Sequence, residues 1–147
     1  MVIRMAAVKS FRELNVYKHA REAARMVFVM TKRFPKEERY ALTDQIRRSS
    51  RAIKAMIAEA WARRRYRAAF IDKIDQAMGE NNETQSWLDD ALDDEYIVAE
   101  EHAELDARYQ AIGGMLARMI DRADDFCKHA SNTDYRTLRE DPPFTDH

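Results

Sequence analysis

Apolar residues recur along most of the chain at alternating steps of three and four residues. One unbroken run lies in the middle of the chain and consists of Phe70, Ile74, Ala77, Asn81, Thr84, Leu88 and Ala91. This spacing places side chains on one face of an α-helix, because the helix has about 3.6 residues per turn. The pattern therefore predicts long amphipathic helices that bury one face against each other.

Composition supports the same fold class. Glycine and proline, three of each in 147 residues, are too scarce for the many turns of a sheet-rich fold. The periodic runs predict four helices, at about 15–34, 43–65, 67–92 and 98–128. With short connections they favour an all-α, antiparallel up-down-up-down four-helix bundle over residues 1–130. Residues 131–147 have little apolar content, so we expect a disordered or weakly docked C-terminal tail.

Several residue patterns typical of enzymes are missing from the sequence. A di-iron bundle needs glutamate followed three residues later by histidine on two helices, and no such pair occurs. Cys127 is the only cysteine, which excludes an intrachain disulfide and a cysteine-based zinc site. Phosphate-binding glycine loops and the Gly-x-Ser-x-Gly turn are also absent. We expect no catalytic residues, no metal and no cofactor.

No apolar run approaches the roughly 20 residues of a membrane span. The beginning of the sequence has no apolar segment of the kind found in secretory signals. The expectation is a cytoplasmic protein with no membrane partner.

Several polar residues interrupt the predicted helix faces. His102 lies on the predicted inner face of the last helix, where it favours a hydrogen-bonded core or interface residue over a metal ligand. Asn81 and Ser50 are predicted to be buried and to fix the register of the helices. Gly113-Gly114 predicts either a kink or a close approach of two helices. The acidic run 89–95 favours a solvated loop or a surface for a basic partner over a cation site.

Charge is unevenly divided along the chain. The formal net charge is −1, yet residues 1–73 contain 19 basic and 7 acidic side chains, whereas residues 74–147 contain 6 and 19. The two parts therefore carry about +12 and −13. This division fits helical pairs that neutralise each other, complementary faces of an oligomer, or a basic half that binds an acidic partner.

The basic residues concentrate on the second predicted helix and on the turn after it. Arg47, Arg51 and Lys54 recur at i, i+4 and i+7, so they line the outer face of that helix. Arginine presents forked donors that match phosphate oxygens, and Trp61 and Tyr66 lie among the later arginines. The predicted nucleic-acid-binding residues are Arg47, Arg48, Arg51, Lys54, Arg63, Arg64, Arg65 and Arg67. The alternative is a face that pairs with acids of a neighbouring helix or subunit.

Ordered matches over residues 11–120 carry a family resemblance. The most specific ones are Glu38, Tyr40, Leu42, Thr43, Gln45, Ile46, Arg47 and Arg48, followed by Ile57-Ala58-Glu59. They resemble the four-helix-bundle family of 23S rRNA intervening-sequence proteins, which is similar to the accessory proteins of diversity-generating retroelements. Met56 and Ala60 stand where many members have asparagine and glycine.

The resemblance implies an antiparallel bundle that assembles as a homo-oligomeric ring of five, without a known catalytic centre. It also implies an association with ribosomal RNA insertions and, in the retroelement relatives, with a reverse transcriptase and nucleic acid. We therefore expect a non-enzymatic homo-oligomer that binds structured RNA, or an RNA-containing complex, through its basic face. The alternative is a protein-interaction scaffold in which that face meets the acidic third and fourth helices of a neighbouring subunit.

Overall fold

The computed structural model describes residues 7–128, and every regular element among them is a helix. Four of them are long: α1 (Asn15–Thr31), α2 (Leu42–Ala62), α3 (Arg67–Asp93) and α4 (Ala99–Asp121). The other elements within residues 7–128 are short, namely the 3₁₀ turns η2 (Phe11–Glu13) and η3 (Lys36–Glu38) and the helix α5 (Ala123–Lys128). The predicted all-α class is confirmed, and the prediction for the tail 131–147 lies outside the described residues.

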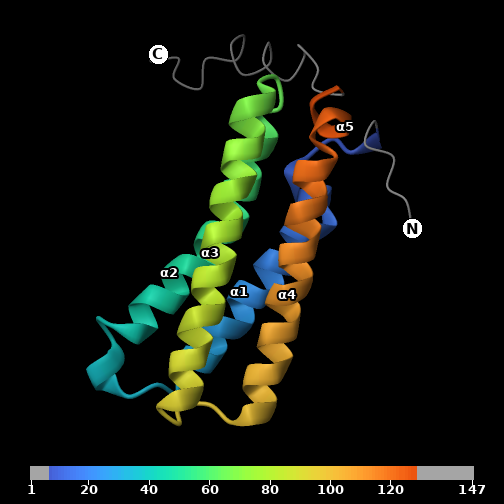
Figure 1. Cartoon of the computed structure of the whole chain (residues 1–147). Coiled ribbons are helices and arrows are strands. Elements are labelled where there is room, and N and C mark those ends of the chain that lie inside the picture. Colours follow the sequence, from blue (N-terminus) through green and yellow to red (C-terminus); the bar gives the residue numbers. More distant parts are fainter. Residues whose placement is uncertain (1–6, 129–147) are drawn as a thin grey trace, which may run out of the picture.

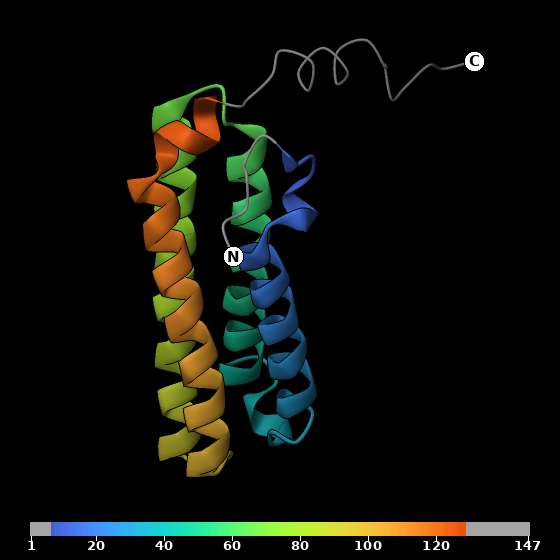
Figure 2. The same ribbon diagram turned by 90° about the vertical axis from the view of Figure 1, so that its right-hand side faces the viewer.

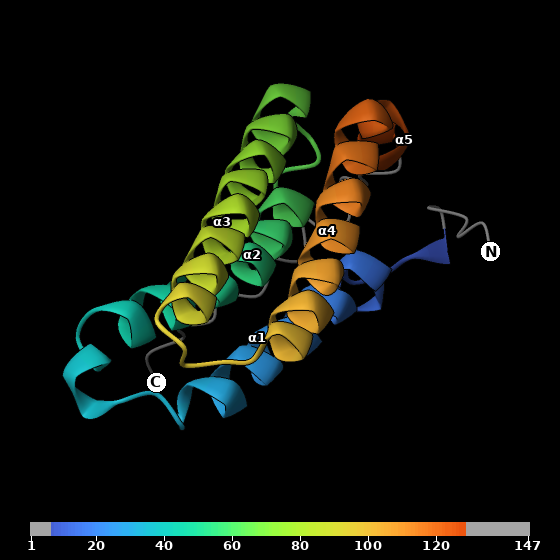
Figure 3. The same cartoon turned by 60° about the horizontal axis from the view of Figure 1, so that its bottom comes forward.

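The long helices form two layers, α1 with α2 and α3 with α4 (Figure 1, Figure 2). Successive helices run in opposite directions. Each helix packs on its two neighbours, so that α1 and α3 both contact α2 and α4 (Figure 3). This is the predicted up-down-up-down bundle, and it leaves one broad outer face to the α1–α2 layer.

The buried faces are those that the three-four spacing predicts. On α3 the buried residues are Phe70, Ile74, Ala77, Asn81, Thr84, Leu88 and Ala91, the whole of the predicted run. Burial of each large apolar side chain stabilises the fold by about 1.5–3 kcal/mol. The sequence spacing therefore identifies which side of each helix faces the core.

Hydrogen bonds between buried polar side chains link the layers and the helices within them. Thr84 Oγ1 lies 2.8 Å from Ser49 Oγ, which joins α3 to α2. Asn81 Nδ2 donates to the Tyr109 carbonyl at 2.9 Å, which joins α3 to α4. A Cβ atom on Gly113 would lie only 3.2 Å from Asn81 Nδ2. Because α4 continues without a break through this glycine, Gly113 serves a close approach of side chain to helix rather than a kink.

Three predicted helix ends are wrong, and the first is that the helix predicted over 15–34 ends at Thr31. The helix predicted over 98–128 is divided at Arg122, whose φ of −107° and ψ of 26° end α4. The new helix α5 then begins with acidic residues in its first turn, where the helix dipole favours anions. The helix predicted over 43–65 ends at Ala62, because Arg63 leaves the helical conformation.

The α3–α4 connection is tight because Glu95 adopts a left-handed conformation, with φ of 62°. The Tyr96 N–H donates to the Ala91 carbonyl at 2.9 Å, and the Glu95 N–H donates to the Leu92 carbonyl at 3.0 Å. These two bonds form the Schellman motif that ends many helices. The motif allows α3 to continue through Asp89 and Asp90, further into the acidic run than its unfavourable charge suggests.

Candidate nucleic-acid interface

A groove runs along the outer face of the α1–α2 layer. It is a hollow of about 650 Å³, which we call the α1–α2 groove, lined by Lys18, Arg21, Glu22, Ala24, Arg25, Phe28, Arg51 and Lys54. Five of these residues are cationic, three from α1 and two from α2, and one is a carboxylate. The antiparallel pairing of two amphipathic helices thus brings two rows of positive charge side by side.

Phe28 lies at the centre of the cationic residues. Four cationic groups lie near its ring, and their distances to the ring centroid are 4.7 Å for Arg47 Cζ, 4.9 Å for Lys32 Nζ, 5.4 Å for Arg25 Cζ and 5.5 Å for Arg51 Cζ. A cation over the face of an aromatic ring is attracted by the electron density of the ring. Phe28 therefore holds together guanidinium and ammonium groups that would otherwise repel each other.

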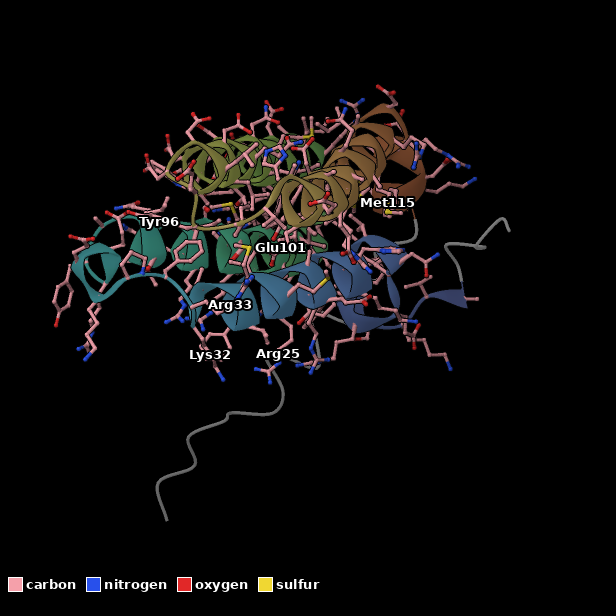
Figure 4. All side chains as sticks on the ribbon, turned by 90° about the horizontal axis from the view of Figure 1, so that it is seen from below. Arg25, Lys32, Arg33, Tyr96, Glu101 and Met115 are labelled. Atoms are coloured by element: carbon pink, nitrogen blue, oxygen red, sulfur yellow. The ribbon has the colours of Figure 1, made fainter. Side chains whose placement is uncertain are left out.

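Arg47 is the most ordered of these cations, because its Nε–H also donates to Thr31 Oγ1 at 2.7 Å. Arg25 and Lys32 extend outward from α1, away from the α3–α4 layer (Figure 4). Arg33, one residue beyond Lys32, turns instead toward α4 and forms an ion pair with Glu101. The consecutive basic residues just after α1, Lys32 and Arg33, thus serve different surfaces.

The cations of the groove have no acidic partners within the described part of the chain. Arg33, Arg67, Lys73, Arg108 and Arg122 each pair with a carboxylate, but no ion pair between residues 7 and 128 involves Lys18, Arg21, Arg25, Arg51 or Lys54. The groove's own carboxylate, Glu22, is engaged by Arg108 of α4, with 3.5 Å between Nη1 and Oε1. The groove therefore presents a net positive charge to solvent.

The predicted nucleic-acid-binding residues of α2 do not all lie at the groove. Arg47 lies beside the groove at Phe28, and Arg51 and Lys54 line it. Arg48 lies near Glu80 of α3. Burial raises the pKa of that carboxyl, Glu83 adds to the increase, and the charge of Arg48 opposes it.

The predicted arginine cluster after α2 is separate from the groove, since it begins roughly 13 Å beyond Lys54 along the helix. Arg64 is only 6% exposed. Its Nε donates to the Trp61 carbonyl at 2.8 Å, and its Cζ lies 3.5 Å from the centroid of the Trp61 ring. Arg64 is therefore part of the packing at the end of α2.

The other arginines of this cluster are exposed. Arg67 pairs with Asp124 of α5, and Arg65 lies 5.9 Å from the ring centroid of Tyr66. Arg63 is exposed at the end of α2. The cluster supplies positive charge at one end of the bundle, with one of its predicted members buried.

Sequence reasoning missed the contribution of α1 to the groove. Lys18, Arg21, Arg25 and Lys32 share one face of that helix with Phe28, at steps of three, four, three and four. This run has the same spacing as the apolar faces, with basic residues in place of apolar ones. Testing each helix for a periodic basic face, as well as an apolar one, would have identified it.

Two other candidates from the sequence have structural explanations. His102 was expected on the inner face of α4, but it is partly exposed and its Nε2 lies 2.8 Å from Asp89 Oδ1 at the α3–α4 end. Burial raises the pKa of the Cys127 thiol, which makes it less reactive.

No group of three or more metal-ligating side chains occurs within residues 7–128. Over the same residues, no helix is long and apolar enough to span a membrane.

These features define a class of protein: an antiparallel four-helix bundle with a cationic groove along one layer. The family model described as 23S rRNA-intervening sequence protein matches residues 12–118, so the chain belongs to that family. A solved structure is also similar, described as a protein with unknown function from the S23 ribosomal protein family of Bacteroides thetaiotaomicron. It is 31% identical with a TM-score of 0.66, over 72% of this chain and 95% of that one. A comparison with curated proteins finds no match.

Proposed function

We propose that this protein binds RNA through the α1–α2 groove, without catalysing a reaction. The observation that carries the proposal is the set of groove cations without acidic partners in the described chain. Lysine and arginine side chains that neutralise phosphates release condensed counterions, which supplies most of the free energy of sequence-independent binding. Membership of a family described by an rRNA intervening sequence supports RNA as the anion.

Homo-oligomerisation is part of the proposal, and the family resemblance suggests a ring of five. A ring would repeat the groove once per subunit, so one RNA could contact several copies. Such multivalent contact raises the apparent affinity well above that of a single groove.

The α3–α4 layer supports a second candidate function. Its exposed carboxylates include Asp89, Asp90, Asp93, Asp94 and Glu95. A cationic groove and an acidic layer on opposite sides of one bundle are complementary between neighbouring copies. In this second candidate the groove is covered by the acidic layer of the next subunit, and the protein is a scaffold.

A matched pair of charge reversals tests the RNA proposal. Arg25→Glu with Arg51→Glu inverts two groove cations, whereas Arg12→Glu with Arg118→Glu changes the net charge equally at exposed positions on η2 and α4. We expect the groove variant to lose at least about tenfold in RNA affinity and to show a shallower salt dependence. The control variant should bind like the wild type.

Light scattering on the same three proteins, the wild type and the two double variants, separates the two functions. RNA binding predicts that the groove variant keeps its oligomeric mass, and that wild-type protein as purified has a raised 260/280 absorbance ratio. Dissociation of the groove variant into smaller species, with RNA affinity unchanged per folded subunit, would favour the scaffold instead.

A further inference from the structure

The α1–α2 groove contains charge but no free aromatic surface. Phe28 is its single aromatic lining residue, and this ring is partly buried and surrounded by the cations of Arg25, Lys32, Arg47 and Arg51. Proteins that bind single-stranded nucleic acid stack the bases on exposed aromatic rings. In this groove the ring that could do so is occupied by the protein's own cations.

The exposed aromatic side chains lie elsewhere. Tyr40 is 84% exposed and precedes α2, whereas Tyr66 is 61% exposed and follows it. The two rings are therefore separated by the length of α2, which is roughly 30 Å at 1.5 Å per residue. They are placed at the two ends of the layer, not along the groove between them.

The groove also has few side chains that could read the edges of bases. Such reading relies on amide and carboxylate side chains as well as arginine. Among the lining residues, the one carboxylate is Glu22, which Arg108 already engages, and none carries an amide. What remains is three arginines and two lysines, all of which suit phosphate groups, and of these the arginines could also reach a base edge.

Together with Lys32 just after α1 and Arg47 of α2, which both lie at the Phe28 ring, these cations form two antiparallel rows. The α1 row extends from Lys18 to Lys32, about 21 Å at 1.5 Å per residue, and the α2 row extends from Arg47 to Lys54, about 10 Å. The axes of packed helices lie about 8–10 Å apart, and charged groups of both rows meet around Phe28, within 5.5 Å of its ring centroid. A single strand offers one row of phosphates, whereas a double helix offers two rows that face each other across a groove.

Resting on the RNA-binding function proposed above, we infer that the α1–α2 groove recognises double-helical RNA through its two phosphate rows, without reading the base sequence. Double-stranded RNA is generally recognised in this manner, by shape and by contacts to phosphates and 2′-hydroxyl groups. Phe28 acts as the support that fixes the positions of the cations. It does not contact bases.

Competition between RNA forms tests the inference. The probes are an RNA duplex of about 16 base pairs, a second duplex of shuffled sequence, and a uridine-only strand with the same number of phosphates. By fluorescence anisotropy at several salt concentrations, we expect the duplexes to bind within about twofold of each other and about tenfold tighter than the strand. A strand that binds as tightly as the duplexes overturns the inference and leaves RNA binding intact.

The variant Phe28→Leu tests the role of the ring while keeping an apolar side chain in place. Both RNA forms should lose affinity by a similar factor, so the duplex-to-strand ratio stays within about twofold of wild type. A selective loss of strand binding, about tenfold for one stacked base, would show that Phe28 stacks on bases and would overturn the inference. If Arg25→Glu with Arg51→Glu leaves all three affinities unchanged, the proposed function itself fails.

Discussion

The guanidinium carbon of Arg47 lies 4.7 Å from the centroid of the Phe28 ring. This contact joins α2 to α1 at the middle of the cationic face, and the Arg47 Nε–H bond to Thr31 Oγ1 holds the guanidinium in that position. An arginine fixed in this way loses little side-chain entropy when a phosphate binds to it. The contact therefore stabilises the packing of α1 on α2. It also holds the Arg47 guanidinium in place beside the groove before a phosphate binds.

Replacement of Thr31 by valine removes the acceptor of Arg47 while keeping the shape of the side chain. We expect Thr31→Val to lower the free energy of unfolding by about 1.5–3 kcal/mol, because a partly buried charged donor loses its partner. Urea unfolding gives the value. The matched control is Thr43→Val, since Thr43 is also buried but forms no side-chain hydrogen bond to another described residue. Equal losses in the two variants would contradict the role assigned to the Arg47–Thr31 bond.

Glu22 and Arg108 form a pair that sets the charge of the groove. Glu22→Gln should raise RNA affinity about two- to fivefold at low salt, because it removes the groove's carboxylate. Arg108→Ala should lower the affinity, because Glu22 is then released to neutralise groove cations. In the Glu22→Gln background, Arg108→Ala should have little further effect, which anisotropy titrations of the four proteins can measure. Arg118→Ala, at an exposed cation on the same helix, is the control.

Arg63 and Arg64 are adjacent arginines with opposite environments, which makes them a matched pair. Arg64→Ala should destabilise the fold by about 2 kcal/mol, because it removes a hydrogen bond from a charged donor and a cation–π contact with Trp61. Arg63→Ala should change stability by at most about 0.5 kcal/mol. Thermal unfolding separates them, and comparable stability in the two variants would show that the buried arginine is dispensable for packing.

Glu95 is a non-glycine residue in the left-handed region, at the position after a helix where glycine is favoured. Glu95→Gly should stabilise the protein by up to about 1 kcal/mol through relief of backbone strain. Glu95→Ala removes the same negative charge without that relief, so it isolates the backbone contribution. Chemical denaturation of both variants should place glycine above alanine, and the reverse order would contradict the assignment.

The Arg33–Glu101 ion pair between α1 and α4 predicts a pH-dependent contribution to stability. The hydrogen bond from Arg33 lowers the pKa of Glu101 below its ordinary value of 4.5, and this effect exceeds the opposing effect of burial. Because the folded-state pKa is the lower one, the stabilisation is present above pH 4.5 and disappears as the pH falls through the folded-state value. Glu101→Gln should cost at most about 1 kcal/mol at pH 7, since both side chains are partly exposed.

Urea unfolding of wild type and Glu101→Gln across pH 3 to 7 measures this contribution. The two unfolding curves should converge at the acidic end of the range. A difference that persists at pH 3 would show that the glutamine side chain fits the site poorly, independently of charge.

The sequence determines the buried faces of this fold because burial on a helix is a periodic property. Asn81 and Thr84 are polar, but they keep the three-four spacing of their apolar neighbours. The spacing therefore predicts the core face of α3 even at these two positions. Helix ends depend on contacts from elsewhere in the chain, which periodicity does not encode. Arg64 is an example, since its burial follows from stacking on Trp61 and not from its position in a run of arginines.

For a related reason, the sequence predicted the α2 side of the candidate site but not its α1 side. The basic face of α2 follows from the spacing of Arg47, Arg51 and Lys54 within one helix. The groove itself depends on which helix lies beside α2 and on how that helix is rotated. Only the packed bundle shows that Arg25 and Phe28 of α1 face those same residues.

At least one of the polar contacts described above spans each pair of neighbouring helices. Arg47–Thr31 joins α2 to α1, and Thr84–Ser49 joins α3 to α2. Asn81–Tyr109 joins α3 to α4, and Arg33–Glu101 joins α4 to the residues just after α1. Sliding any helix by one turn, about 5.4 Å, would break two of these contacts at once. The four helices should therefore move as a single rigid body, because none of them can slide along its neighbours without losing polar contacts on both sides.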